Sequence, residues 1–309
     1  MKYMLKTKSV GSGMMQLLNR FCIYHKLKSP VSHTYGLNDH IVFDRWLDKL
    51  GYIHKQYKKE GLGLEIAKHV DASDVGLCGY MVNCCETISD YLSFFTKYSK
   101  IWYNYTQKKV YFLEDEVVIS WNQASYFNAG LYTQETIISE ELQVAIIYQR
   151  ILQIVGEGNP VFNRVEFGIP SPTDKLIYEK YFKCPITFNS KKTNLFISKD
   201  ILNLKIVNSD KTLFNILTHY ADIVLKEIPE ASDFLQLVKI GILNSIVNGE
   251  PKIDEVADSL NLSVRTLQKK LSDSSTSFQD LLKEVRFFLA KKYLLENEKS
   301  ILEIANLLG

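Results

Sequence analysis

Two nine-residue stretches near the C-terminus share one pattern, and this pattern decides how that part of the chain folds. The first reads IDEVADSLN (Ile253–Asn261) and the second, 48 positions further on, reads ILEIANLLG (Ile301–Gly309). In both, apolar residues at the first, fourth and eighth positions and an alanine at the fifth form one stripe on a short helix. The ninth residue is Asn or Gly, which adopt the left-handed conformation that ends helices. The pattern predicts the first helix and turn of a helix-turn-helix, present twice.

The residues after the first copy predict the second helix of that motif. Ser263 is a residue type favoured at helix N-caps. Val264, Leu267 and Leu271 then recur at helical spacing and predict an inward face. Between the two copies, apolar residues keep helical spacing from Phe278 to Asn297, which predicts one long helix joining the motifs.

The outward face of the predicted second helix is rich in side chains that bind DNA. Arg and Lys reach guanine edges or phosphates, and Gln pairs with adenine. We therefore expect a recognition helix whose DNA contacts come from Ser263, Arg265, Thr266, Gln268, Lys269 and Lys270. Ser263 caps the helix, Thr266 and Lys270 are assigned to phosphate, and the other three are assigned to bases.

The whole region resembles the DNA-binding domain of the AraC/XylS family of transcription regulators. The matching elements are VADSLNLSVRTLQKKL, TSFQDLLKEVRFFLAKKYLLEN and SILEIANLLG. The resemblance implies that Arg265, Gln268 and Lys269 face the major groove and that Arg286 is structural. It also implies double-stranded promoter DNA and RNA polymerase as partners.

The family pattern continues with a second recognition helix and a final helix, whereas this sequence stops at Gly309. We therefore expect a truncated second motif in which four apolar residues lose packing surface: Leu302, Ile304, Leu307 and Leu308. From Pro251 to Gly309, nine Lys and Arg balance nine Asp and Glu, so phosphate contacts are expected to add only modest affinity. The alternative function is a truncated module that does not bind DNA and pairs with a full-length regulator or is inert.

The remaining two thirds of the chain predict an α+β domain over residues 1–205. Aromatic and β-branched residues from Ile101 to Trp121, broken near Lys108 and Asp115, predict antiparallel strands. The other expected strands are Val161–Gly168, Ile186–Phe188 and Asn194–Ile197. Helices are expected at Ile41–Leu47, Ile66–Val70, Thr87–Tyr98 (N-cap Thr87), Glu140–Val155, Thr173–Phe182 and Thr212–Ile228, the last broken at Pro229–Ser232.

Two segments here resemble the arabinose-binding-like N-terminal domain of many AraC-type regulators. They are DVGLCGYMVNCCETISDYLSFFTKY (Asp74–Tyr98) and VEFGIPSPTDKLIYEKYFKCPITFN (Val165–Asn189). The resemblance implies a regulatory domain over residues 1–205 that binds a small-molecule effector or mediates homodimerisation. Residues 206–232 are then a linker helix and hinge, and residues 233–309 an all-α helix-turn-helix domain.

Two groups of residues are candidate sensors, each with a plain alternative. Six aromatic residues either line an effector pocket or divide between core and surface: Trp102, Tyr103, Tyr105, Tyr111, Phe112 and Trp121. Cys78, Cys84 and Cys85 lie close together in the sequence and form either a thiol sensor or small buried apolar contacts.

Composition excludes several other classes of protein. The net charge of +2 excludes a polycation, and the odd cysteine count, five, without a C-x-x-C pair argues against a disulfide framework or a zinc site. No apolar run reaches the ~18–20 residues of a membrane span, which predicts a cytoplasmic protein without a membrane partner. The six histidines lack metal spacing and the G-x-G pairs lack a third glycine, so we expect no enzymatic activity, metal or cofactor.

Overall fold

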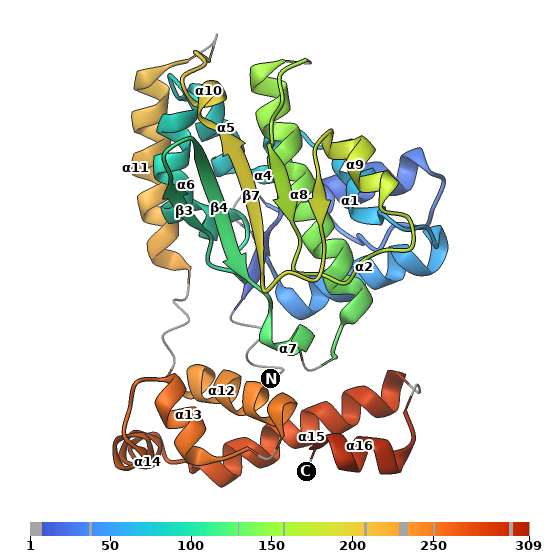
Figure 1. Cartoon of the computed structure of the whole chain (residues 1–309), viewed down its shortest axis with the longest axis vertical. Coiled ribbons are helices and arrows are strands. Elements are labelled where there is room, and N and C mark those ends of the chain that lie inside the picture. Colours follow the sequence, from blue (N-terminus) through green and yellow to red (C-terminus); the bar gives the residue numbers. More distant parts are fainter. Residues whose placement is uncertain are drawn as a thin grey trace. The chain divides into compact units, whose positions relative to one another are not determined.

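The computed structural model describes residues 8–36, 39–128, 130–156, 158–206, 209–228, 234–249, 251–296 and 299–308. The chain forms two compact units. Among the described residues, those within 8–123 and 134–228 form the N-terminal unit, and those within 124–133 and 234–308 form the C-terminal unit. The first combines a sheet with helices and the second is helical, which confirms the predicted fold class (Figure 1).

A five-stranded sheet in the order β3-β4-β7-β5-β6 organises the N-terminal unit. Neighbouring strands are antiparallel except β5 and β6, which are parallel. A separate antiparallel pair joins β1 to β2. The strands are β1 (Ser9–Gly11), β2 (His40–Val42), β3 (Lys109–Phe112), β4 (Glu116–Asn122), β5 (Arg164–Glu166), β6 (Ile186–Thr187) and β7 (Lys192–Ser198).

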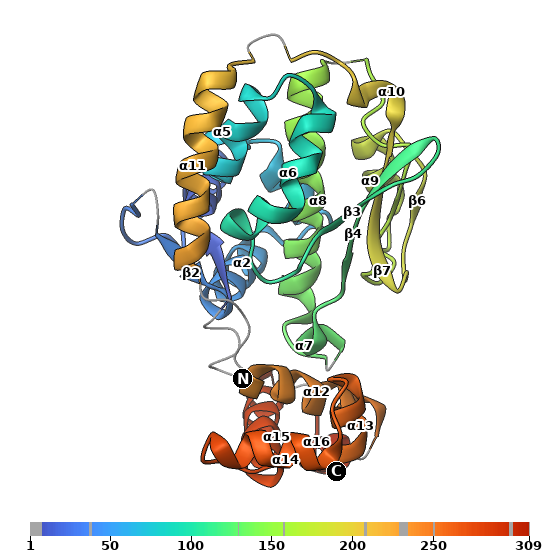
Figure 2. The ribbon, with the colours of Figure 1, turned by 90° about the vertical axis from the view of Figure 1, so that its left-hand side faces the viewer.

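Helices cover the sheet and build the rest of the N-terminal unit. Figure 2 shows the sheet on one side of the long helix α8 and helix α11 on the other. Most of α8 between Thr136 and Ile151 is buried, as expected of a helix enclosed on both sides. The helices are α1 (Gly13–Tyr24), α2 (Phe43–Tyr57), α3 (Leu62–Ala67), α4 (Ala72–Val75), α5 (Leu77–Cys84), α6 (Ile88–Trp102), α8 (Thr133–Val155), α9 (Leu176–Phe182), α10 (Lys199–Leu202) and α11 (Lys211–Glu227).

Several boundaries in this unit differ from the prediction: α8 begins at Thr133 rather than Glu140, and the helix expected at Ile66–Val70 is α3. In two places a residue belongs to a different type of element. Ile41 and Val42 lie in β2 rather than in a helix, because their backbone pairs with β1, and α2 begins only at Phe43. Ile101 and Trp102 belong to α6 rather than to a strand. The capping box at the start of α6 and its buried face sustain the helix through these residues, so tertiary packing overrides their β propensity.

The C-terminal unit is a helical bundle. Its core contains Val238, Ile242, Val256, Leu267 and Val285, which come from four helices. The Lys239 ammonium of α12 lies 2.6 Å from a carboxylate oxygen of Glu284 on α15. The helices are α7 (Ser125–Asn128), α12 (Phe234–Asn248), α13 (Ile253–Ser259), α14 (Val264–Asp273), α15 (Phe278–Glu296) and α16 (Ile301–Leu308).

Some predicted features fall on residues that the structure does not describe. Three such features are the break at Pro229–Ser232, the end at Asn297 of the helix predicted to join the two motifs, and the turn at Gly309. Within the described ranges, no helix is both long enough and apolar enough to cross a membrane.

Candidate nucleic-acid interface

The turn between α13 and α14 has the geometry that the first repeat predicts. Asn261 adopts a left-handed conformation with φ of 54°. The backbone N–H of Leu262 donates to the carbonyl oxygen of Ala257 at 2.9 Å. Ala257 is fully buried, so its small side chain lets the neighbouring helix approach closely. The chain therefore reverses sharply and α14 begins only three residues after the turn residue.

Helix α14 begins at the predicted cap. Ser263 Oγ accepts a hydrogen bond from the backbone N–H of Thr266 at 3.2 Å, and the two side-chain hydroxyl oxygens lie 2.8 Å apart. The first turn of α14 contains no acidic residue. Its N-terminus therefore presents backbone N–H groups and a partial positive charge, which favour a phosphate.

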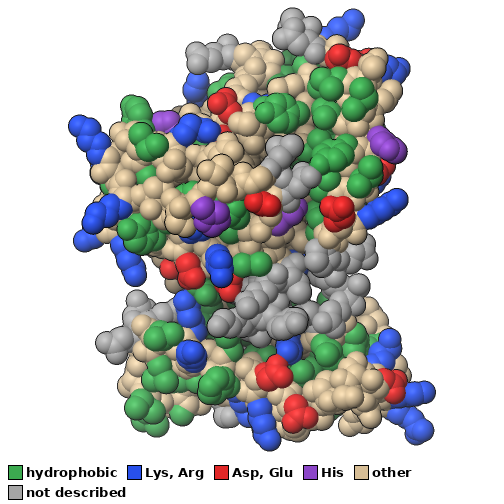
Figure 3. Space-filling view, turned by 180° about the vertical axis from the view of Figure 1, so that it is seen from behind, with side chains coloured by type: hydrophobic (Ala, Val, Ile, Leu, Met, Phe, Trp, Pro, Cys, Tyr) green, Lys and Arg blue, Asp and Glu red, His purple; other side chains and the backbone are tan. Residues whose placement is uncertain are grey.

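The two faces of α14 separate as the sequence predicts. Leu267 and Leu271 are buried and Val264 is partly buried. The outward residues are all exposed: Arg265, Thr266, Gln268, Lys269 and Lys270. Figure 3 shows Lys and Arg side chains at the end of the C-terminal unit that contains α14. A basic, hydrogen-bonding face therefore projects from a helix anchored by two buried leucines.

The outward residues differ in what they contact within their own unit. The Lys270 ammonium lies 5.3 Å from the centre of the Phe234 ring of α12, a cation–π distance. The Thr266 hydroxyl takes part in the cap with Ser263. These are the two residues assigned to phosphate on sequence grounds.

The second repeat forms α16, although its packing differs from that of the first. Ile304 and Leu308 are buried, whereas Leu302 and Leu307 are exposed. The exposure of Leu302 and Leu307 agrees with the predicted loss of packing. The burial of Ile304 and Leu308 contradicts that prediction, because α16 packs on α12 and α15. Figure 3 shows hydrophobic side chains at this end of the unit. Arg286 of α15 is only partly exposed and its Nε is buried.

The six aromatic residues of the N-terminal unit do not line one pocket. Tyr111 and Phe112 are exposed on β3, at the edge of the sheet, and Tyr105 is partly buried, with its ring stacked on that of Phe43. Trp102, Tyr103 and Trp121 are buried, and their ring centres lie 5.0 to 5.5 Å from the ammonium of Lys108. The prediction that these residues divide between core and surface is therefore confirmed, and the prediction that they line one pocket is wrong.

A buried polar network occupies the space between these rings. Lys108 Nζ donates to Gln143 Oε1 at 2.9 Å, and burial lowers the pKa of Lys108 to about 8. Glu140 accepts hydrogen bonds from Trp121 Nε1 at 2.8 Å and from the Thr193 hydroxyl. The protein's own lysine therefore fills this aromatic cage.

The three clustered cysteines behave as buried apolar residues. Cys78, Cys84 and Cys85 are all buried. Burial raises the pKa of Cys78 and of Cys85 to about 12, which suppresses the reactive thiolate. The Cys78 thiol donates to the carbonyl oxygen of Tyr98 at 3.0 Å. These observations favour packing over thiol sensing.

Comparison with known proteins identifies the N-terminal region. Residues 50–206 match the arabinose-binding domain found at the N-terminus of AraC transcription regulators. The chain belongs to this family. The match confirms the resemblance seen in Asp74–Tyr98 and Val165–Asn189, both of which lie inside it.

Similar proteins cover both units of the chain. The chain is 25% identical over 279 residues to the HTH-type transcriptional regulator VqsM of Pseudomonas aeruginosa, covering 85% of this chain and 79% of that protein. It is 22% identical over 249 residues to the ornithine utilization regulator of the same organism, covering 80% and 71% of the two proteins. The HTH-type transcriptional activator CfaD of Escherichia coli is 30% identical over 122 residues, which are 39% of this chain and 42% of that protein.

A solved structure has the same overall fold. The crystal structure of the transcriptional regulator CdpR from Pseudomonas aeruginosa superimposes with a TM-score of 0.52 and 18% sequence identity. The superposition covers 96% of this chain and 90% of that one. The relatives are transcription regulators by their names, and the likeness to the solved structure shows a shared fold.

Proposed function

We propose that this protein is a sequence-specific DNA-binding transcription regulator that reads promoter DNA with α14. The observation that carries the proposal is the exposed face of a capped helix whose opposite face is held by Leu267 and Leu271. A helix presented in this way fits the major groove of B-DNA. The N-terminal unit is the regulatory part.

Each outward residue has a role that its chemistry supports. Arg265, Gln268 and Lys269 follow one another at offsets of three and one, so they share one side of α14. Arg265 offers two parallel donors to guanine O6 and N7, Gln268 pairs with the edge of adenine, and Lys269 supplies a third donor. Thr266 and Lys270 contact phosphates and thereby fix the register of the helix on DNA.

We propose further that α11 pairs with α11 of a second copy. Three apolar residues of α11 are 42 to 60% exposed: Leu213, Ile216 and Ile223. Their offsets of three and seven are those of the a and d positions of a coiled coil. A stripe of this kind fits an identical helix, because the same spacing on both partners lets their side chains interlock. A symmetric dimer would present two α14 helices to two half-sites of an operator.

Binding to DNA from upstream of the protein's own gene tests the first proposal. Fluorescence anisotropy is measured at two salt concentrations, with scrambled DNA as competitor. Tight, salt-sensitive binding that resists the competitor supports the proposal. Binding equal to the scrambled control would overturn it and would leave pairing with another regulator as the function of the chain.

Replacement of single lysines separates DNA contact from bulk charge. Lys269→Ala should weaken binding, whereas Lys191→Ala, an exposed lysine of the N-terminal unit, should not. Both variants remove one positive charge. An equal loss in the two variants would mean that binding is non-specific attraction to a cation.

A further inference from the structure

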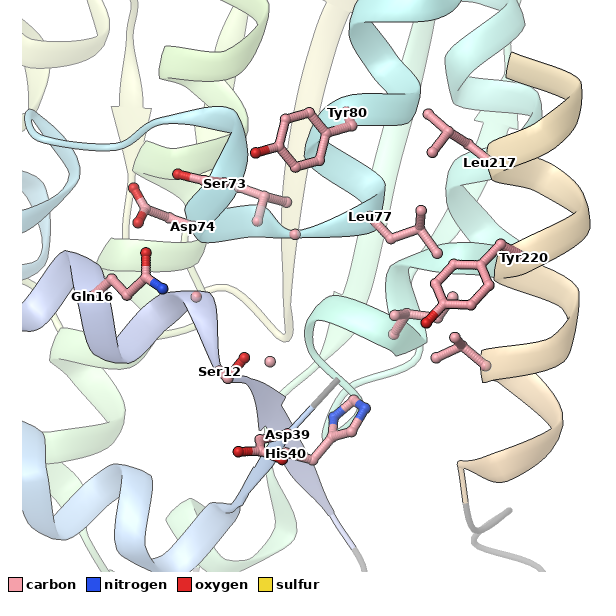
Figure 4. A pocket seen from close by; sticks show the side chains of 16 residues that line it. Ser12, Gln16, Asp39, His40, Ser73, Asp74, Leu77, Tyr80, Leu217 and Tyr220 are labelled. Carbon is pink, nitrogen blue, oxygen red and sulfur yellow. The ribbon is translucent and has the colours of Figure 1, made fainter. Parts of the chain in front are cut away.

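A pocket with a volume of about 170 Å³ lies inside the N-terminal unit, bounded on one side by α11 (Figure 4). Figure 4 shows Leu217 and Tyr220 projecting from α11 on the side that faces Leu77 of α5. Other parts of the lining come from β1, α1, β2, α4 and α6. The residues involved span positions 11 to 224, so no single sequence motif marks the site.

Glycines fix the backbone around this pocket. A Cβ at Gly13 would lie 2.5 Å from the carbonyl oxygens of Ser73 and Asp74, so only glycine lets α1 begin against α4. Gly76 has φ of 64° and turns the chain between α4 and α5. The wall opposite α11 is therefore held by close backbone contact, which favours a preformed site.

The titratable groups in the lining are partnered or neutral, except for one buried carboxylate oxygen. Asp74 Oδ2 forms an ion pair with Arg20 and accepts a hydrogen bond from the backbone N–H of Asp71 at 2.8 Å, whereas the buried Asp74 Oδ1 has no hydrogen-bond partner among the described residues. The Asp39 carboxylate accepts one from the backbone N–H of Gly36 at 2.7 Å. Burial lowers the pKa of His40, which keeps its ring neutral at pH 7.

The lining thus favours one class of ligand. It includes two aspartates and neither Lys nor Arg, so a bound anion would lack a counter-charge. Its apolar wall consists of Val75, Leu77, Ile101, Leu217 and Val224, and hydroxyl groups of serine and tyrosine provide hydrogen-bonding positions. Apolar cavities of ~150 Å³ hold a benzene molecule, so the size suits a single substituted ring.

We propose that this pocket is an effector site for a small uncharged ring compound that carries a hydroxyl or carbonyl group. Its occupancy would act on α11. Only Ala221 and Val224 are buried among the residues of this helix, whereas Leu217, Tyr220 and Val224 line the pocket. A ligand would therefore add apolar contacts on the inner face of α11. The regulatory consequence rests on the proposed function, in which α11 pairs two copies; ligand binding itself does not.

Three probes with the same ring and different charge test the ligand class. Benzyl alcohol, benzylamine and benzoate are titrated into the full-length chain at pH 7 by isothermal calorimetry, in the absence of DNA. Benzyl alcohol should bind saturably. Benzoate should bind at least about tenfold more weakly, because the lining has no Lys or Arg to pair with its carboxylate. Benzylamine should also bind at least about tenfold more weakly, because the Asp74 carboxylate is already paired with Arg20. Equal affinity for benzoate or benzylamine would overturn the assignment of an uncharged ligand.

Matched substitutions on α11 test the location of the site. Leu217→Trp fills the pocket and should abolish binding of benzyl alcohol, and the milder Leu217→Phe should weaken it. His219→Trp adds the same side chain at an exposed position of the same helix and should leave binding unchanged. Unchanged binding in both Leu217 variants would overturn the site. Because no DNA is present, failure here is distinct from failure of the DNA-binding proposal.

Discussion

Ser263 Oγ accepts a hydrogen bond from the backbone N–H of Thr266 at 3.2 Å, and this contact sets the start of the helix that we assign to DNA recognition. Ser263→Ala removes the acceptor and should destabilise α14 by about 1 kcal/mol. Hydrogen exchange of the amides of α14 measures the loss. Ser263→Asn keeps an acceptor and should exchange nearly as slowly as the natural protein, so equal protection in all three would show that the cap contributes nothing.

The turn before α14 depends on the left-handed backbone of Asn261, with φ of 54°. A β-carbon without a local polar group is strained in this conformation, and glycine is not. Asn261→Ala should therefore be about 1 kcal/mol less stable than Asn261→Gly, as measured by hydrogen exchange over α13 and α14. The reverse order would mean that the turn adopts another conformation.

The stability of the N-terminal unit should fall as pH rises from about 4.5 to about 7. Burial raises the pKa of Glu141 from 4.5 to about 7, although the Tyr178 hydroxyl and the backbone N–H of Gly63 both donate to its carboxylate. The folded state therefore binds a proton that the unfolded state has released in this range, and the contribution is fully present only below pH about 4.5. The difference in pKa corresponds to about 3 kcal/mol.

Urea unfolding followed by tryptophan fluorescence measures this effect. All three tryptophans, Trp46, Trp102 and Trp121, lie in the N-terminal unit. Glu141→Gln should remove most of the pH dependence between pH 5 and 7, whereas Glu227→Gln, at an exposed position, should leave it intact. A pH dependence unchanged by Glu141→Gln would assign it to another group.

A charge in the α11 stripe should separate the two copies of a dimer. Ile216 is 60% exposed and lies in the middle of the stripe, so Ile216→Glu introduces a repulsive pair across the proposed interface. Sedimentation equilibrium should show a shift from dimer to monomer. Thr212→Glu adds the same charge outside the stripe and should preserve the dimer. A natural protein that sediments as a monomer would rule out the pairing.

Features set by short sequence separations were predictable from the sequence. The repeat, the Ser263 cap, the left-handed Asn261 and the two faces of α14 depend on residues within about ten positions of one another, where helical spacing dominates. The helix at Thr87 was predictable for the same reason, because its capping box joins Thr87 to Asp90.

Features that depend on distant partners were not predictable from the sequence. The sequence pattern predicts a turn near Lys108, yet this side chain is buried among the rings of Trp102, Tyr103 and Trp121. Its ammonium donates a hydrogen bond to Gln143 of α8. Ile41 became a strand residue only because β1 lies 31 positions earlier and pairs with it. The exposure of Ile216 is equally hidden, since a helical pattern does not reveal which apolar residues the fold leaves uncovered.

The measurement that tests the central claim most directly is the affinity of Arg265→Ala for the operator and for a set of operators with single base changes. The account predicts a loss of about 1–3 kcal/mol on the operator and a loss of discrimination at one base pair, with other positions read as before. Lys191→Ala serves as the charge-matched control. If Arg265→Ala binds the operator with unchanged affinity and unchanged base preference, α14 does not read DNA in the way proposed.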